Sequence, residues 1–360
     1  PVGNAWVEAD VNVSSSESIM RQVLAGHSYF KSEFDRESNE FMIPDCFGFP
    51  YSLPSILNHC GLRGFSTQKL TWESANGIPF DVGRWIGPDG NYVIAALNGG
   101  DYAREHPANY SNNKEMLKQL QDNGKKSGLP IHWTYMGGGD RNNSDRGGTP
   151  RVANLENIEN NAKNPGPVNV VVDRAGLMFE AITEKQAEKL PSWNSDLLLI
   201  KHSTGVLTSQ TYTKQINHDA ELLINAAERA AVSAAYLSNI AYPTRPLHDA
   251  WKMVLRNQFH DILPGTSIPA AQARTWNDGI IALNQSQGVY TDAIGSLATS
   301  LDTSARGVPL VIHHPLSIDR DDVVEAMIPE SLKHARALTA YNAEGEAQPT
   351  QLTTDWDGTR

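Results

Sequence analysis

The stretch FMIPDCFG, Phe41–Gly48, decides how the first half of this chain is expected to fold. Its apolar start predicts a short buried strand, and Pro54–Gly61 after it predicts a helix that ends at a glycine. Asp45 is therefore expected at the C-terminal end of a strand. In α/β sheets this is the edge where ligands bind and where catalytic carboxylates gather.

Short β-rich runs alternate with helical segments over residues 6–207, which is typical of a parallel-stranded α/β domain. The run Gly61–Thr67 predicts a second strand, and this strand would bring Lys69 to the same sheet edge as Asp45. Arg84–Ile94 predicts a hairpin, because Pro-Asp-Gly supplies the backbone angles of a tight turn. We expect this hairpin to decorate the domain rather than to extend its parallel core.

Three long helical patterns follow, at Thr213–Leu237, Pro246–Leu263 and Ile268–Leu301. The connections between them are short, so neighbouring helices should run antiparallel and form a three-helix bundle. The pattern then becomes β-like again, in Val308–His314 and Asp322–Ile328.

The composition of the 360 residues narrows the classes of partner. A net charge of -11 argues against a nucleic-acid partner, because such proteins normally cluster Lys and Arg on one face. The chain contains no apolar stretch close to the roughly 20 residues that a membrane helix needs, so no membrane partner is expected. A small neutral or cationic substrate fits this charge better. A homo-oligomer is compatible with the sequence, and the cellular compartment is left open.

A second informative stretch is NQFHDILPGT, Asn257–Thr266. Its His260 is predicted near the end of an amphipathic helix, with Asp261 able to hold one ring nitrogen or to face a substrate. The Pro-Gly turn that follows would direct His260 towards the α/β domain. A carboxylate at Asp45 and this imidazole together suggest a shared metal ion. The alternative is a histidine at a helix C-terminus, which the helix dipole favours.

Further candidates surround these two positions. Phe47 beside Asp45 would supply an aromatic wall of the kind that sugar rings stack on. Asp140 lies in the glycine-rich run Tyr135–Arg141 and could act as a general acid, although a solvated turn or a phosphate-binding loop would have a similar composition. His202 is a weaker site candidate, because it has no partner at a fixed spacing.

Four stretches of the chain resemble, in order, glycoside hydrolase family 38, the retaining α-mannosidases. These stretches are Trp6–Asp10 continuing to Gln22, Pro44–Gly48 with Leu53 and Pro54, Phe65–Trp72, and Gln258–Thr266. The second and the fourth stretch are the most specific. The resemblance implies that the substrate is a mannose-containing oligosaccharide or glycan and that the cofactor is one zinc ion.

The resemblance also implies roles for individual residues. Asp45 matches the family's nucleophile, which is also a zinc ligand, and His260 matches a second zinc ligand. Phe47, Lys69 and Asp261 match positions near the sugar. Asp140 matches the acid/base residue, with Asp145 as the alternative, because residues 142–146 look inserted before the next glycine pair.

Two further zinc ligands of the family come from a His-x-Asp element upstream of the stretch that matches Trp6. The chain is therefore expected to be the central part of a longer mannosidase, inactive alone, because two ligands hold zinc weakly. The implied fold class is a parallel-stranded α/β, barrel-like catalytic domain at 1–207, a three-helix bundle at 208–304 and the start of a β-sandwich at 305–360.

Two other functions remain open at this point. A metal-dependent carbohydrate deacetylase would use zinc to activate water and would form no glycosyl-enzyme. A carbohydrate-binding protein that has lost catalysis would keep the pocket without the metal.

Overall fold

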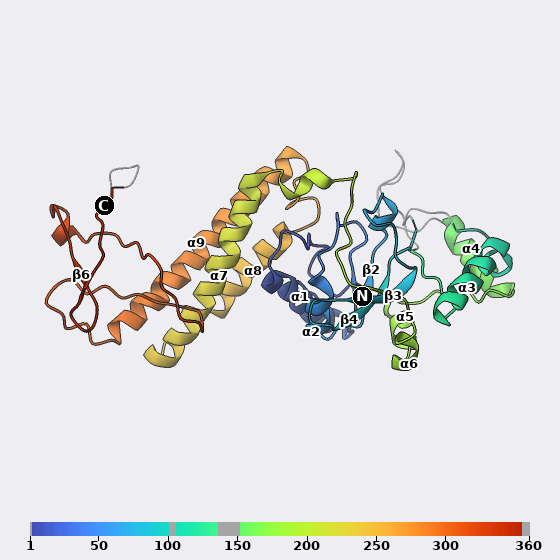
Figure 1. Ribbon diagram of the computed structural model, residues 1–360, viewed down its shortest axis with the longest axis horizontal. Coiled ribbons are helices and arrows are strands. Elements are labelled where there is room, and N and C mark those ends of the chain that lie inside the picture. The colour runs from blue at the N-terminus through green and yellow to red at the C-terminus, as the bar shows by residue number, and fades with distance from the viewer. Residues whose placement is uncertain (1, 101–105, 136–151, 355–360) are drawn as a thin grey trace. The chain divides into compact units, whose positions relative to one another are not determined.

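The computed structural model describes residues 2–100, 106–135 and 152–354. Its residues group into two compact units, Pro1–His313 and His314–Arg360. The first unit contains a sheet with its covering helices and a group of three long helices (Figure 1).

The sheet of the first unit has five strands in the order β1-β2-β4-β3-β5. Three of its four strand pairs are parallel, and only β3 with β4 is antiparallel. The strands are β1 (Glu40–Met42), β2 (Gly64–Ser66), β3 (Val82–Ile86), β4 (Tyr92–Ala96) and β5 (Ser192–Trp193). The mixed α/β prediction is thus confirmed. Among the described residues the sheet is open, with β1 and β5 as its edges, so the barrel-like expectation finds no confirmation.

The predicted hairpin forms β3 and β4, but its expected role was wrong. Strand β4 pairs in parallel with β2, so the hairpin extends the sheet instead of decorating it. The reason is burial, because Val93, Ile94 and Ala95 are all at most 1% exposed and need cover on both faces of the strand.

The core of the sheet is aromatic. Phe41 and Phe65 lie opposite each other on β1 and β2, and both are fully buried. The Phe65 ring is 5.0 Å from Trp85 and 5.3 Å from Phe49, between ring centroids. Fully burying such side chains stabilises the fold by roughly 1.5–3 kcal/mol each.

The described part of the first unit forms nine α-helices, and α7, α8 and α9 make up the three-helix group. They are α1 (Ser16–Phe34), α2 (Leu53–His59), α3 (Lys114–Ser127), α4 (Val152–Lys163), α5 (Gly176–Ala181), α6 (Glu184–Ala187), α7 (Thr211–Ser238), α8 (Thr244–Asn257) and α9 (Pro269–Thr299). Short 3₁₀ turns occur at Lys69–Thr71, Tyr110–Asn112, Thr204–Leu207 and Glu330–Leu332.

Helices α7, α8 and α9 pack on one another, which confirms the predicted helical domain (Figure 1). Small buried residues, including Ala220, Ala227 and Ala250, line the contact around Trp251 and allow the helices to approach closely. Helix α8 ends at Asn257, earlier than predicted. His260 therefore follows the helix, because its backbone N–H bonds to the Glu8 carbonyl at 3.0 Å instead of continuing the helix.

Helix α1 contacts the three-helix group through a charged pair. The Arg21 guanidinium donates to both carboxylate oxygens of Glu228 at 2.8 and 2.5 Å and lies 4.2 Å from the centre of the Trp251 ring. Trp251 Nε1 also donates to Glu228 at 3.0 Å. This bidentate and stacked geometry is typical of a firm Arg–carboxylate contact.

The second unit is described by itself. Its strands are β6 (Ala340–Tyr341) and β7 (Ala347–Gln348), which pair antiparallel. Strands were predicted at 308–314 and 322–328, and neither forms. A strand needs a neighbouring strand to pair with, and among the described residues no strand pairs with either run. The β-sandwich stays a prediction.

Among the described helices, none combines the length and the apolar character that crossing a bilayer requires.

Candidate active site

Asp45 and His260 meet at the carboxyl edge of the parallel strands. Asp45 follows β1, and Lys69 follows the neighbouring parallel strand β2, as predicted. His260 Nε2 lies 3.7 Å from Asp45 Oδ2. The His260 side chain is only 8% exposed and that of Asp45 is 24% exposed, so the pair is mostly buried and Asp45 still reaches solvent.

Lys69 neutralises Asp45. Its ammonium group makes an ion pair with the Asp45 carboxylate, although the Lys69 side chain is only 3% exposed. The ammonium also lies 4.9 Å from the centre of the Phe47 ring and 4.3 Å from that of Trp72. Two aromatic faces and one carboxylate thus compensate the burial of this cation.

The predicted residues Phe47 and Asp261 also reach the site. The Phe47 ring lies edge-on to His260, with ring centroids 6.2 Å apart. Asp261 Oδ2 is 3.7 Å from His260 Nε2, and its other oxygen accepts a hydrogen bond from Thr266 at 2.5 Å. The Asp261 side chain is 44% exposed, so a bound molecule could contact it.

His202 joins the same cluster. Its ring centroid is 4.7 Å from that of Trp72 and 5.8 Å from that of Phe47. Burial, with a smaller contribution from the Lys69 charge, lowers the pKa of His202, which favours a neutral ring at pH 7. Trp72 was not singled out from the sequence as a site residue, although it ends a stretch that resembles the family.

Glu8 is a site residue that sequence reasoning missed. Its carboxylate accepts a hydrogen bond from the Asp45 backbone N–H at 2.6 Å, and its other oxygen lies 3.7 Å from His260 Nδ1. Burial raises the pKa of the Glu8 carboxyl, and the nearby His260 opposes that rise. The only signal in the sequence was an acidic residue inside the family-like run Trp6–Asp10.

Three potential metal donors lie close together around His260. A ring nitrogen of His260, a carboxylate oxygen of Glu8 and the thiol of Cys46 are all within 4.8 Å of one another. The Cys46 thiol, however, donates to the Ala9 carbonyl at 3.0 Å, and burial raises its pKa well above the usual range. A raised pKa favours the protonated thiol, whereas the thiolate is the form that binds metals.

The two candidates for the acid/base role, Asp140 and Asp145, lie outside the described residues. The nearest described residue before them is Tyr135. Its hydroxyl donates to Ser66 on β2 at 3.2 Å, and its backbone N–H bonds to Gly99 at 3.2 Å. The start of the glycine-rich run is therefore tied to the same sheet edge.

A buried polar network holds the segment that precedes His260. Gln258 donates to Glu221 at 2.9 Å and to Asn217 at 3.1 Å, both on α7. Gln22 of α1 donates to Gln258 at 3.2 Å, and Glu221 also accepts from Ser18 at 2.6 Å. The segment that carries His260 is thus held by α1 and α7 together.

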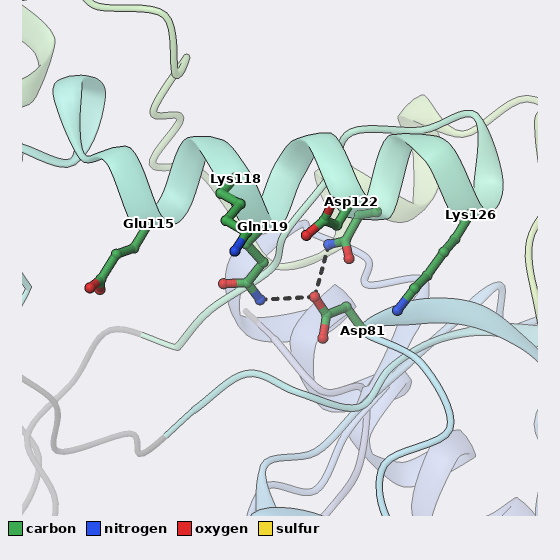
Figure 2. A pocket seen from close by; sticks show the side chains of 7 residues that line it. Asp81, Glu115, Lys118, Gln119, Asp122 and Lys126 are labelled. Atoms are coloured by element: carbon green, nitrogen blue, oxygen red, sulfur yellow. Dashed lines mark hydrogen bonds between the residues drawn. The ribbon is translucent and has the colours of Figure 1, made fainter.

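A separate hollow of about 400 Å³ lies beside α3 (Figure 2). Figure 2 shows the Asp81 carboxylate below the helix, with a hydrogen bond from Gln119. Burial alone would raise the pKa of Asp81, but hydrogen bonds from four neighbours outweigh it and hold the pKa well below its usual range. The lining mixes acidic and basic side chains, so it selects no ligand class; it comprises Asp81, Glu115, Lys118, Gln119, Asp122, Asn123 and Lys126.

Comparison with known proteins assigns the chain to a family. A family model described as the glycosyl hydrolases family 38 N-terminal domain matches residues 1–196. The chain belongs to glycoside hydrolase family 38. A second model, the alpha mannosidase middle domain, matches residues 201–297. The family resemblance found in the sequence is confirmed.

The chain is similar to proteins that are named alpha-mannosidases. Human alpha-mannosidase 2C1 is 33% identical over 270 residues, which cover 74% of this chain and 25% of the human protein. An alpha-mannosidase of Saccharomyces cerevisiae is 30% identical over 273 residues, covering 74% of this chain and 25% of that protein. The chain spans about a quarter of the length of these relatives.

Solved structures of family 38 share the fold. The crystal structure of an alpha-mannosidase from Enterococcus faecalis V583 matches with a TM-score of 0.66 at 20% identity, covering 84% of this chain and 34% of that one. Another family 38 protein from Enterococcus faecalis matches with a TM-score of 0.58 at 19% identity, covering 84% and 32%. The likeness extends to a mixed α/β fold with a helical domain.

Proposed function

We propose that the protein containing this chain is a retaining α-mannosidase, which hydrolyses terminal α-D-mannosidic bonds of oligosaccharides or glycans with the help of zinc. The relatives named as alpha-mannosidases support the substrate class. The observation that carries the proposal is the approach of His260 Nε2 to Asp45 Oδ2 at 3.7 Å, beside the Lys69 ammonium.

The donor pair fits one zinc ion. Zinc binds imidazole nitrogen at about 2.0–2.1 Å and carboxylate oxygen at about 2.0–2.2 Å, and the sum of these lengths exceeds the 3.7 Å between the two donors. A bound zinc ion would act as a Lewis acid and orient hydroxyl groups of the sugar. The pair leaves coordination positions for further ligands.

In the proposed reaction Asp45 is the nucleophile. One carboxylate oxygen attacks the anomeric carbon as the glycosidic C–O bond breaks, and Asp140, with Asp145 as the alternative, protonates the leaving oxygen. The same acid/base residue then takes a proton from a water molecule as the water oxygen attacks the anomeric carbon, and the bond from this carbon to Asp45 breaks, which releases the sugar. Retention requires the two carboxyl groups to be about 5–5.5 Å apart.

The other predicted site residues would hold the sugar. Lys69 balances the charge of Asp45 and directs one of its oxygens. Phe47 lies beside the nucleophile and packs against His260, and the exposed Asp261 can accept hydrogen bonds from sugar hydroxyls.

We also propose the domain limits 1–207, 208–304 and 305–360. The change between the two family models, at residues 196 and 201, supports a boundary before α7. The start of α7 at Thr211 is compatible with it.

The direct test is Asp45→Ala in the full-length protein. Loss of the nucleophile should lower the turnover of an aryl α-mannoside by about 10⁴-fold or more. A fluorinated mannosyl reagent should label Asp45 in the wild type, because only a covalent mechanism traps that residue. The control is Asp292→Asn, an exposed carboxylate on α9, which should keep wild-type turnover.

Other outcomes would favour the alternatives. Stoichiometric zinc with release of acetate, but no label on Asp45, would indicate a deacetylase. Sugar binding without zinc or turnover would indicate a binding protein. Near-normal turnover in Asp45→Ala would overturn the nucleophile assignment.

A further inference from the structure

The segment around Glu8 runs beside the segment that carries His260. The Asp10 N–H donates to the Gln258 carbonyl at 2.8 Å, and the His260 N–H donates to the Glu8 carbonyl at 3.0 Å. Between these bonds, Ala9 and Phe259 form an antiparallel bridge. The backbone of Glu8 is therefore fixed directly opposite His260.

The Glu8 carbonyl also determines which His260 nitrogen carries the proton. His260 Nδ1 is 3.2 Å from this carbonyl oxygen, which can only accept a hydrogen bond. A neutral His260 ring thus carries its proton on Nδ1 and has a lone pair on Nε2, the nitrogen that faces Asp45. Metal-binding histidines commonly have this arrangement, with the second ring nitrogen donating to a carbonyl or a carboxylate.

The Glu8 side chain acts on the other member of the pair. One carboxylate oxygen accepts the Asp45 N–H at 2.6 Å, which fixes the backbone from which the Asp45 side chain extends. The other oxygen lies 3.7 Å from His260 Nδ1. Glu8 thus contacts both proposed zinc ligands, Asp45 through its backbone N–H and His260 through Nδ1.

We infer that Glu8 is a positioning residue, which directs Asp45 and His260 so that both can bind one divalent cation. The inference rests on the proposed function. Direct ligation by Glu8 fits the geometry less well, because an ion between Glu8 and His260 would displace the Nδ1 proton from its bond to the Glu8 carbonyl. The thiol of Cys46, the third potential metal ligand nearby, already donates a hydrogen bond to the Ala9 carbonyl.

The experiment measures zinc affinity of the full-length protein by competition with a chelator. Glu8→Ala should bind zinc about 10–100-fold more weakly than the wild type, the usual effect of losing a residue that orients metal ligands. Glu8→Gln should bind more tightly than Glu8→Ala, because its amide oxygen can still accept the Asp45 N–H. The control is Glu37→Gln, which removes the same charge from an exposed carboxylate after α1.

A second measurement separates positioning from ligation and from misfolding. The absorption spectrum of the cobalt-substituted protein should keep its band positions in Glu8→Gln, because the ligand set is unchanged. Wild-type zinc affinity in Glu8→Ala would overturn the inference alone, and so would a shifted cobalt spectrum in Glu8→Gln. A wild-type protein that binds no zinc would overturn the proposed function together with the inference.

Discussion

His260 Nε2 lies 3.7 Å from Asp45 Oδ2, although Asp45 follows a strand of the sheet and His260 follows a helix of the three-helix group. Neither element could create the pair alone. The site depends on the contact between the two parts, which the backbone bonds from Asp10 to Gln258 and from His260 to Glu8 hold in place. Changes that loosen this contact should therefore lower zinc affinity before they unfold the protein.

Lys69→Met should reduce catalysis strongly. The substitution leaves the Asp45 carboxylate without its cation, and it leaves Phe47 and Trp72 without the ammonium between them. We expect kcat/KM for an aryl α-mannoside to fall by about 10²–10³-fold, the usual effect of removing one group that stabilises charge in an active site. Steady-state kinetics of the full-length protein measures this.

The matched control for this change is Lys201→Met. Lys201 pairs with Glu73 on the surface, where its side chain is 74% exposed, so its loss should leave kcat/KM unchanged. Equal kinetics in wild type and Lys69→Met would show that Asp45 does not depend on the ion pair.

Local patterns predicted most of the proposed site. An apolar run followed by Pro-Asp placed Asp45 at a strand end, and a second run placed Lys69 at the same edge, because parallel strands end on one side of a sheet. The three helices were also predictable from their spacing of apolar residues. These features depend on the local sequence.

Features that depend on distant partners were not predictable. Helix α8 ends earlier than predicted because the His260 N–H bonds to the Glu8 carbonyl, and the hairpin is part of the sheet because β4 pairs with β2. Glu8 itself lies outside the named helices and strands, so no periodicity marks its side chain. Its role is visible only once the fold brings Asp45 and His260 to it.

Glu221→Ala should weaken both the fold and the zinc site. Glu221 is 7% exposed, and one of its oxygens accepts from the Ser15 N–H at 3.0 Å, Ser18 at 2.6 Å and Gln258 at 2.9 Å. Leaving such donors unsatisfied costs about 1–3 kcal/mol each, and the effects do not add fully, so we expect the free energy of unfolding to fall by roughly 3 kcal/mol. Urea denaturation measures this fall.

A second effect of Glu221→Ala follows from the position of Gln258 in the chain, two residues before His260. Zinc affinity, measured by chelator competition, should fall several-fold. Asp219→Ala, an exposed carboxylate on the same helix, is the control and should change neither quantity. If Glu221→Ala unfolded at the wild-type urea concentration, the network would contribute no stability.

Asp81→Asn should destabilise the protein in a pH-dependent way. The Asp81 carboxylate accepts from Asn98 at 2.5 Å, Gln119 at 3.0 Å and Asn123 at 2.8 Å, and it lies 3.6 Å from His132 Nδ1. The interaction with His132, together with these bonds, outweighs burial and holds the pKa of Asp81 below the unfolded value of about 3.9. A depressed carboxyl pKa stabilises the fold fully above the unfolded pKa, and this stability is lost as the pH falls towards the folded pKa.

At pH 7 the Asp81→Asn variant should lose about 1–3 kcal/mol of unfolding free energy relative to wild type, because an amide nitrogen would face these donors. The difference should shrink between pH 4 and 2. Urea denaturation at each pH measures it, with Asp292→Asn as the control that should follow the wild type throughout. A difference that stayed constant down to pH 2 would show that the ionised Asp81 carboxylate is not the source of the stability.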